Sequence, residues 1–128
     1  MTPEAALRAY AAMLNTLDPS RLAPYLAKDF HYASQNVFAE IESSAEYLSY
    51  MQGKFETLRA CAPDRAVKAQ MGRLTSVFPG DPCVIVEQGG EVVANVLVRV
   101  ADGLIQRLDL CSVAPEPGSA IATGEYPG

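Results

Sequence analysis

The sequence has little that would hold a metal ion. It contains one histidine, His31, and three cysteines, Cys61, Cys83 and Cys111, which lie far apart along the chain. A structural zinc site needs four ligands, commonly in closely spaced pairs, and neither C-x-x-C nor H-x-x-x-H is present. We therefore expect no metal and no cofactor, and we expect the cysteines to be reduced and packed as small hydrophobic side chains.

Positive charge is also scarce. Ten lysines and arginines stand against fifteen acidic residues, which gives a net charge of -5 and a pI of about 4.8. A field of this sign repels phosphate backbones and anionic lipid head groups, so we expect no nucleic-acid and no membrane partner. No apolar run approaches the ~20 residues of a membrane helix, and the N-terminus lacks the features of a signal peptide. The expected location is cytoplasmic.

Apolar residues, in contrast, are sufficient for one core. They make up 49% of the 128 residues, and charged residues make up 20%, which is typical of a globular domain. Proline and glycine gather near the C-terminus. We therefore expect a single domain over residues 1–113 and a flexible tail over residues 114–128.

Three helices are predicted from capping signals and helical periodicity. Thr2 can cap a helix that has Pro3 at its first position, and Ser43 and Glu46 have the spacing of a capping box. Pro24 lacks a backbone N–H and should keep the second helix short. The predicted helices span residues 3–17, 19–27 and 43–61.

The pattern of the second half is typical of strands joined by tight turns. Gly72 interrupts the alternation of the first long strand, which predicts a β-bulge there. Ahead of the third helix, a strand is predicted at residues 30–34, with a short return at 37–41. The later strands are predicted at residues 67–78, 83–88, 91–100 and 104–113.

Two short strings resemble a known family. Tyr10-Ala11-Ala12-Met13-Leu14-Asn15, followed by Asp18, resembles the first helix of ketosteroid isomerases, and Leu26-Ala27-Lys28-Asp29 resembles the segment before their first strand. With this order of elements, residues 3–113 resemble the nuclear transport factor two-like superfamily, in its SnoaL-like branch. The resemblance implies a cone-shaped, cystatin-like α+β fold in which three N-terminal helices pack on the concave face of a curved, mostly antiparallel sheet. The implied order is helix, helix, strand, helix and four strands.

Ketosteroid isomerase chemistry itself is not expected. The resemblance implies a hydrogen-bonding tyrosine at Tyr10, a general base at Ser34 and a second proton donor at Val96. Serine is no base at neutral pH without an activating partner, and valine has no proton to donate. Two of the three groups that the reaction needs are therefore missing.

One face of the predicted sheet is almost entirely apolar, if the Gly89-Gly90 hairpin has two residues and the next hairpin three. We expect this face to meet the helices and line a cavity. The opposite face carries Asn95, Arg99, Arg107 and Asp109 among apolar residues, which favours a sheet-to-sheet homodimer. The predicted inward residues are Cys83, Ile85, Glu87, Val92, Ala94, Val96, Val98, Val100, Leu104, Gln106, Leu108 and Leu110.

Three titratable residues are candidate general bases beside Tyr10. Glu87 would have a raised pKa if it were buried in the cavity, or would be an exposed residue at a strand end. His31 alternates with inward-facing neighbours and is expected on the outer face, unless a bulge reverses it. Asp109 is expected to pair with Arg99 or Arg107, or to enter the pocket if its strand shifts by one residue.

Two functions remain open. The first is a noncatalytic homodimer whose cavity binds or senses a small apolar molecule. We favour it because the predicted strand register places no acid–base pair in the cavity. The second is a SnoaL-like isomerase, cyclase or dehydratase that needs no cofactor, with Tyr10 as oxyanion donor. Tyr47 and Met51 lie on helical stripes and could equally be core residues. The predicted ligand contacts are Tyr10, Tyr32, Ser34, Tyr47, Met51 and Gln106.

Overall fold

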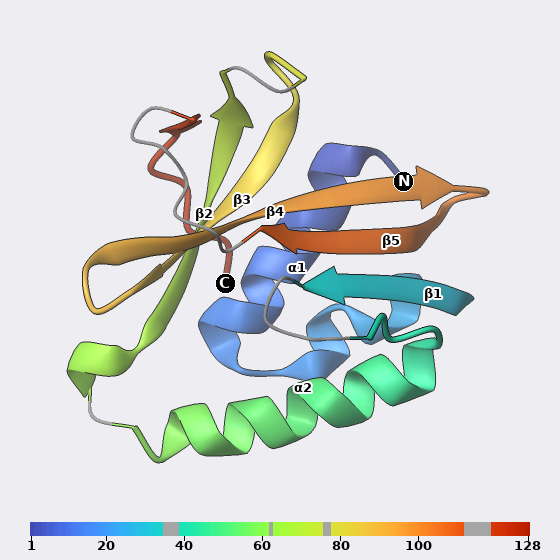
Figure 1. Cartoon of the computed structure of the whole chain (residues 1–128), viewed down its shortest axis with the longest axis horizontal. Coiled ribbons are helices and arrows are strands. Elements are labelled where there is room, and N and C mark those ends of the chain that lie inside the picture. The colour runs from blue at the N-terminus through green and yellow to red at the C-terminus, as the bar shows by residue number, and fades with distance from the viewer. Residues whose placement is uncertain (35–38, 62, 76–77, 112–118) are drawn as a thin grey trace.

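A six-stranded sheet curves around two α-helices in the computed structural model of the chain (Figure 1). The structure describes residues 1–34, 39–61, 63–75, 78–111 and 119–128. The helices are α1 (Pro3–Thr16) and α2 (Ser44–Arg59), with 3-10 turns η1 (Pro19–Arg21), η2 (Ala23–Tyr25) and η3 (Pro63–Arg65). The strands are β1 (Leu26–Ser34), β2 (Val67–Leu74), β3 (Pro82–Gln88), β4 (Glu91–Ala101), β5 (Leu104–Cys111) and β6 (Ala120–Ala122).

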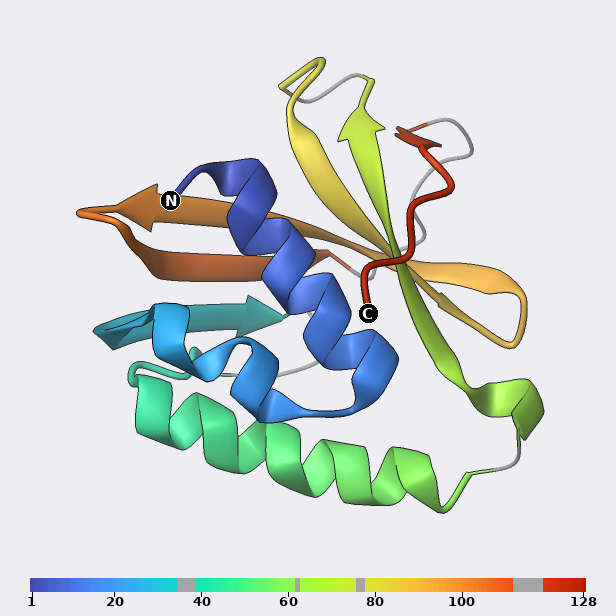
Figure 2. The same ribbon diagram turned by 180° about the vertical axis from the view of Figure 1, so that it is seen from behind.

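The sheet is mostly antiparallel, as the sequence predicts. Its strand order is β1-β5-β4-β3-β2-β6, and β1 pairs in parallel with β5 while the other neighbouring strands pair antiparallel. Helix α1 packs on β2, β3 and β4, and α2 packs on β1 (Figure 2). The prediction of an α+β domain with helices on a curved sheet is therefore confirmed.

Both capping predictions are also confirmed. The Thr2 side chain accepts a hydrogen bond from the Ala5 amide at 3.1 Å, and the Ser43 side chain accepts one from the Glu46 amide at 3.1 Å. Helix α1 ends where Leu17 adopts a left-handed conformation, with φ of 53°. These local bonds satisfy amides that the first turn of each helix leaves unpaired.

The segment between the two helices differs from the prediction. The expected second helix consists of the two 3-10 turns η1 and η2, and β1 already begins at Leu26. Pro24, inside the expected helix, lacks the backbone N–H that a regular α-helix needs there. Ile41, from the expected strand at residues 37–41, pairs with Tyr32 in an isolated antiparallel bridge. The rest of that expected strand lies largely outside the described residues.

The bulges of the sheet lie elsewhere than predicted. Strands β2 and β3 pair continuously through Gly72 and Cys83, so the expected bulge at Gly72 is wrong. The register instead shifts between Val86 and Glu87 where β3 meets β4, and between Arg99 and Val100 where β4 meets β5. Each shift inserts one residue into one strand and reverses the facing of the residues beyond it.

These shifts decide which side chains face the helices. Val84 and Val86 of β3 enter the main core, whereas Cys83 and Ile85, predicted to point inward, form a second apolar cluster with Leu74. At the start of β5, Ile105 faces the core in place of the predicted Leu104 and Gln106. The predicted facing is correct for the buried core residues Ala94, Val96 and Leu108. It is also correct for the partly buried residues packed against them, which are Val98, Val100 and Leu110.

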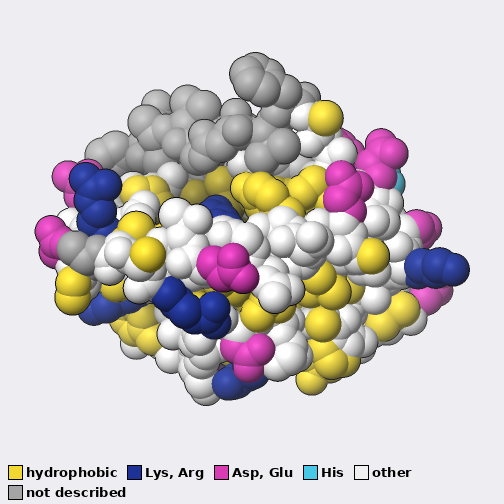
Figure 3. All heavy atoms as spheres, turned by 90° about the horizontal axis from the view of Figure 1, so that it is seen from below, with side chains coloured by type: hydrophobic (Ala, Val, Ile, Leu, Met, Phe, Trp, Pro, Cys, Tyr) yellow, Lys and Arg dark blue, Asp and Glu magenta, His cyan; other side chains and the backbone are white. Residues whose placement is uncertain are grey.

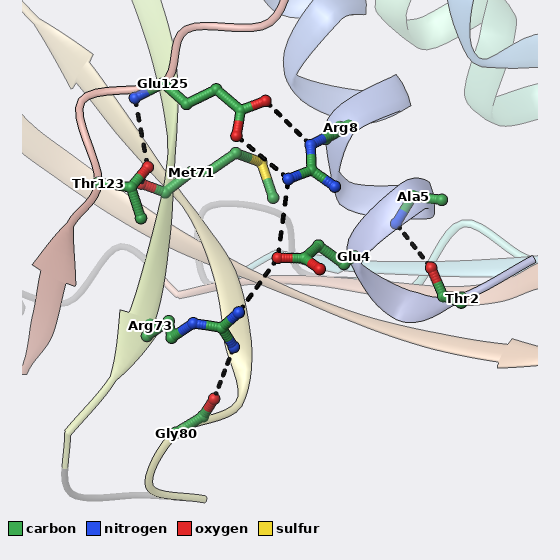
Figure 4. Close-up of polar contacts among 9 residues, drawn as sticks. All are labelled: Thr2, Glu4, Ala5, Arg8, Met71, Arg73, Gly80, Thr123 and Glu125. Carbon is green, nitrogen blue, oxygen red and sulfur yellow. Dashed lines mark hydrogen bonds and ion pairs between the residues drawn. The ribbon is translucent and has the colours of Figure 1, made fainter.

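Residues 119–128, which the sequence assigns to the tail, complete the sheet edge. Strand β6 pairs with β2, and the Met71 amide donates to the Glu125 carbonyl at 2.9 Å. The Glu125 carboxylate accepts two hydrogen bonds from Arg8 of α1, and Glu4 lies between Arg8 and Arg73 (Figure 4). These contacts cover the edge of β2, which would otherwise present unpaired backbone groups.

Candidate functional site

Four tyrosines converge where α1, β1 and α2 meet. Tyr10 comes from α1, Tyr32 from β1, and Tyr47 and Tyr50 from α2. The ring centroids of Tyr32 and Tyr47 are 4.9 Å apart, and those of Tyr32 and Tyr50 are 6.0 Å apart. Tyr10, Tyr32 and Tyr47 are almost completely buried, whereas Tyr50 is 37% exposed. We refer to these four residues as the tyrosine cluster, and Tyr50 connects it to solvent.

The buried hydroxyls of the cluster stay protonated. Burial raises the pKa of Tyr10 and of Tyr47 well above the usual value, and the other hydroxyls of the cluster raise the pKa of Tyr47 further. Burial also raises the pKa of Tyr32 to about 12, although its hydrogen bond with Ser34 acts in the opposite direction. At neutral pH these groups are therefore neutral phenols that can donate hydrogen bonds.

The hydroxyl of Tyr47 has no hydrogen-bond partner among the described residues. Its ring is fully buried and packs edge-on against Phe30, with centroids 4.9 Å apart, while Met51 and Phe55 extend the apolar wall along α2. A buried hydroxyl without a partner loses about 1–3 kcal/mol of hydration that nothing replaces. The interior thus contains an unused hydrogen-bond donor surrounded by apolar side chains.

Lys54 is a functional candidate that the sequence analysis missed. Seven residues make almost two helical turns, so Lys54 lies on nearly the same face of α2 as Tyr47, one turn after Tyr50. Its side chain is half-buried, and burial lowers its pKa. Within the described part of the chain, Lys54 makes no hydrogen bond and no ion pair. The i, i+7 spacing from Tyr47 is the signal that could have identified it.

Glu87, the leading candidate base, does not lie at the tyrosine cluster. Its Oε1 accepts hydrogen bonds from Gln70 Nε2 at 2.5 Å and from the Tyr126 hydroxyl at 2.8 Å. Gln70 in turn accepts a hydrogen bond from the Gly124 amide at 3.0 Å. Glu87 also borders a surface hollow with Lys68 and other residues near the hairpin. Its described contacts therefore attach the C-terminal segment to the sheet.

His31 and Asp109 take part in an ion-pair group on the surface. Glu40 lies 3.1 Å from His31 Nδ1 and 2.9 Å from Arg107, which also binds Asp109. The hydrogen bonds from Arg107, and then from His31, lower the pKa of Glu40 to about 2. Gln106 lines a shallow hollow with His31 and Arg107 and is separated from the tyrosines by the bulge in β5. The predicted enclosure of Tyr10, Ser34, Glu87 and Gln106 is therefore not formed.

Solved structures of other proteins share this architecture. An NTF2-like protein of unknown function from Cytophaga hutchinsonii aligns with a TM-score of 0.60 over 91% of this chain and 94% of its own, at 18% sequence identity. The chain has the NTF2-like fold. This finding confirms the fold that the sequence resemblance implied.

The NTF2-like fold is shared with proteins of different descriptions. A candidate ketosteroid isomerase from Kribbella flavida has a TM-score of 0.58 at 23% identity, covering 84% of this chain and 75% of its own. A candidate polyketide cyclase from Sinorhizobium meliloti has a TM-score of 0.57 at 18% identity, covering 80% and 89%. No protein-family model and no curated protein matches the sequence. Similarity at this level shows the fold, and function has to be argued from the site.

Two further features of the NTF2-like domain concern metals and membranes. Within the described residues, no three His, Cys, Asp or Glu side chains gather in a way that could hold a metal ion. None of the described helices is long and apolar enough to cross a bilayer.

Of the predicted ligand contacts, the structure brings together Tyr10, Tyr32, Ser34, Tyr47 and Met51 around α2 and β1.

Proposed function

We propose that the protein binds a small, mainly apolar molecule at the tyrosine cluster and does not transform it. The observation that carries this proposal is the buried Tyr47 hydroxyl, which has no hydrogen-bond partner in the part of the chain that the structure describes. A ligand with a hydrogen-bond acceptor would pair with this hydroxyl, while Phe30, Met51 and the tyrosine rings would contact its apolar part. The ligand would enter beside Tyr50, the exposed member of the cluster.

Binding is favoured over catalysis by the chemistry of the cluster. The hydroxyls of Tyr10, Tyr32 and Tyr47 have raised pKa values and can donate hydrogen bonds, whereas proton abstraction at neutral pH needs a base such as a carboxylate or a histidine. The candidate bases Glu87, His31 and Asp109 are engaged in the contacts described above. A SnoaL-like isomerase, cyclase or dehydratase remains the alternative. Its support is the fold shared with a candidate polyketide cyclase and a candidate ketosteroid isomerase.

Replacing Tyr47 with phenylalanine tests the proposal. We expect Tyr47→Phe to weaken binding of neutral aromatic amides, with cinnamamide as the first probe, by about tenfold, since one hydrogen bond is lost. The free protein should keep or gain thermal stability, because an unsatisfied buried hydroxyl is removed. Calorimetric titration and thermal unfolding measure the two effects.

Tyr32→Phe is the matched control for stability, because the Tyr32 hydroxyl has a partner in Ser34. This variant should unfold more easily than the wild type, by about 1 kcal/mol. If Tyr47→Phe destabilised the protein as much as Tyr32→Phe and left cinnamamide binding unchanged, the Tyr47 hydroxyl would be a structural group and the proposed site would be wrong.

We also propose that the protein is a homodimer formed through the outer face of the sheet. Leu97 and Arg99 of β4 line a hollow on this face with Phe78, which is 65% exposed. Arg99 has no ion pair with any described residue, so a carboxylate of a second copy could pair with it. Apolar residues beside a free cation are suited to a sheet-to-sheet contact.

Sedimentation provides the test of the homodimer. We expect wild-type protein to sediment as a dimer at micromolar concentration and Leu97→Glu to sediment as a monomer, since the new carboxylate would lose its hydration at the contact and could occupy the Arg99 guanidinium that the second copy needs. Val92→Glu is the control, because Val92 is already 50% exposed beside the Gly89-Gly90 turn. A monomeric wild type would refute the proposed dimer.

A further inference from the structure

The starting point is the position of Lys54 relative to the tyrosine cluster. Side chains of a helix lean toward its N-terminus, so the Lys54 side chain extends over the turn that carries Tyr50. Tyr50 contacts Tyr32, and Tyr32 contacts the buried Tyr47. Lys54 therefore borders the cluster on the side where it reaches solvent.

The second observation is that Lys54 has no counter-ion among the described residues of a protein with a net charge of -5. Several carboxylates pair within the protein, as Glu40 does with Arg107 and Glu125 with Arg8, and charges of both signs are dispersed over the face shown in Figure 3. Lys54 is half-buried and has no ion pair within the described residues. Partial burial of an ammonium group is unfavourable unless an anion compensates it. An anion supplied from outside the chain would provide that compensation.

The third observation concerns the polarity of the whole site. The Tyr47 hydroxyl is buried and has no partner among the residues described, and Lys54 adds three N–H donors and a positive charge. Both groups can donate to a hydrogen-bond acceptor. A negatively charged acceptor suits Lys54, which lies nearer to solvent than Tyr47. A molecule that satisfies both has an apolar body and an anionic end.

We propose that the ligand of the tyrosine cluster is a small organic acid, whose apolar body packs against the tyrosines and whose carboxylate binds Lys54. This inference rests on the proposed function, because it assumes binding at the cluster. It adds the chemical class of the ligand and assigns its charge recognition to Lys54. Recognition by a single ammonium group selects charge more than shape, since lysine acts as a point charge.

A matched pair of probes separates charge recognition from apolar binding. Cinnamate and cinnamamide have the same apolar body and differ in the charged group. We expect wild-type protein to bind cinnamate about tenfold more tightly than cinnamamide, which corresponds to one charge-assisted hydrogen bond. Lys54→Met should abolish this preference and leave the affinity for cinnamamide within about twofold, whereas Lys54→Arg should retain most of it.

The control is Lys28→Met, because Lys28 lies exposed on β1. This variant should keep the wild-type preference, and thermal unfolding should show that every variant is folded. If Lys54→Met kept the preference for cinnamate, or if the wild type had none, the assignment of Lys54 would be wrong. The proposed function would still stand if cinnamamide binding depended on Tyr47. If neither probe bound to the wild type, nor any of a panel of aromatic and aliphatic acid–amide pairs of similar size, both proposals would fail.

Discussion

Replacing Asn15 with alanine is expected to lower the free energy of unfolding by about 2–3 kcal/mol. The Asn15 side chain accepts a hydrogen bond from the Ala69 amide at 2.7 Å and donates to the Ala69 carbonyl at 2.8 Å. The same side-chain amide donates to the Pro127 carbonyl. It thus joins α1, β2 and the C-terminal segment. Alanine would remove three bonds and leave backbone groups at the sheet edge unpaired.

Chemical denaturation measures the loss, and hydrogen exchange locates it. We expect the Ala69 amide to exchange faster in Asn15→Ala, because its acceptor is gone. The neighbouring variant Thr16→Ala is the control, since Thr16 is exposed and, among the described residues, its hydroxyl donates only to the Ala12 carbonyl of its own helix. It should change stability by less than about 0.5 kcal/mol. Equal losses in both variants would contradict the role given to Asn15.

The second large effect is expected at Gly72. A Cβ atom added there would lie 2.6 Å from Ile85 Cδ1 and 3.1 Å from the Ile121 carbonyl oxygen. The side chain of Ile85 and the backbone of β6 would both have to move, so Gly72→Ala should destabilise the protein by about 1–3 kcal/mol. Thermal and chemical unfolding measure this change.

Gly53 provides the matched glycine. It lies inside α2, and a Cβ there would meet nothing within 4 Å, so Gly53→Ala should raise stability by about 0.5–1 kcal/mol. Combining Gly72→Ala with Ile85→Val removes the atom nearest to the added methyl and should recover part of the loss. A neutral Gly72→Ala would show that the sheet adapts to the added carbon without strain.

The predictions that succeeded rest on local chemistry. The caps at Thr2 and Ser43 depend on side chains within three residues of the amides they bind, so the sequence contains all the information. Alternation along β4 identified the inward residues Ala94 and Val96 for the same reason. The resemblance of two short sequence strings to ketosteroid isomerases predicted the fold, and the structural comparison confirmed it.

The errors in side-chain facing arose where one inserted residue in a neighbouring strand changes which side chains point toward the helices. Cys83, Val84, Ile85 and Val86 are all apolar and all buried, so alternation could not show which face of β3 meets the helices. Which face of β3 meets the helices depends on the bulge where β3 meets β4. No glycine or proline at the shifted pairs indicates that bulge in the sequence.

The candidate site was predicted in part for the same reasons. The periodicity of the helices placed Tyr10 and Tyr47 inside. Lys54 was missed because a lysine on an amphipathic helix is usually solvated. Only the surrounding structure shows that it is half-buried and unpaired with any described residue. Gln106 was misplaced by the bulge in β5. Proline and glycine near the C-terminus suggested a tail, whereas β6 forms because β2 has a free edge.

Because β1 pairs in parallel with β5, β1 cannot join the sheet until β5 has been synthesised. Strand β1 follows the first helix closely in the sequence, but its partner is one of the last strands to leave the ribosome (Figure 1). Until then Phe30 and Tyr32 depend for cover on α2, whose Tyr47 ring packs against both. Contacts of such long sequence separation slow folding, so a nascent chain that is stalled before β5 would expose an apolar strand edge and depend on chaperones.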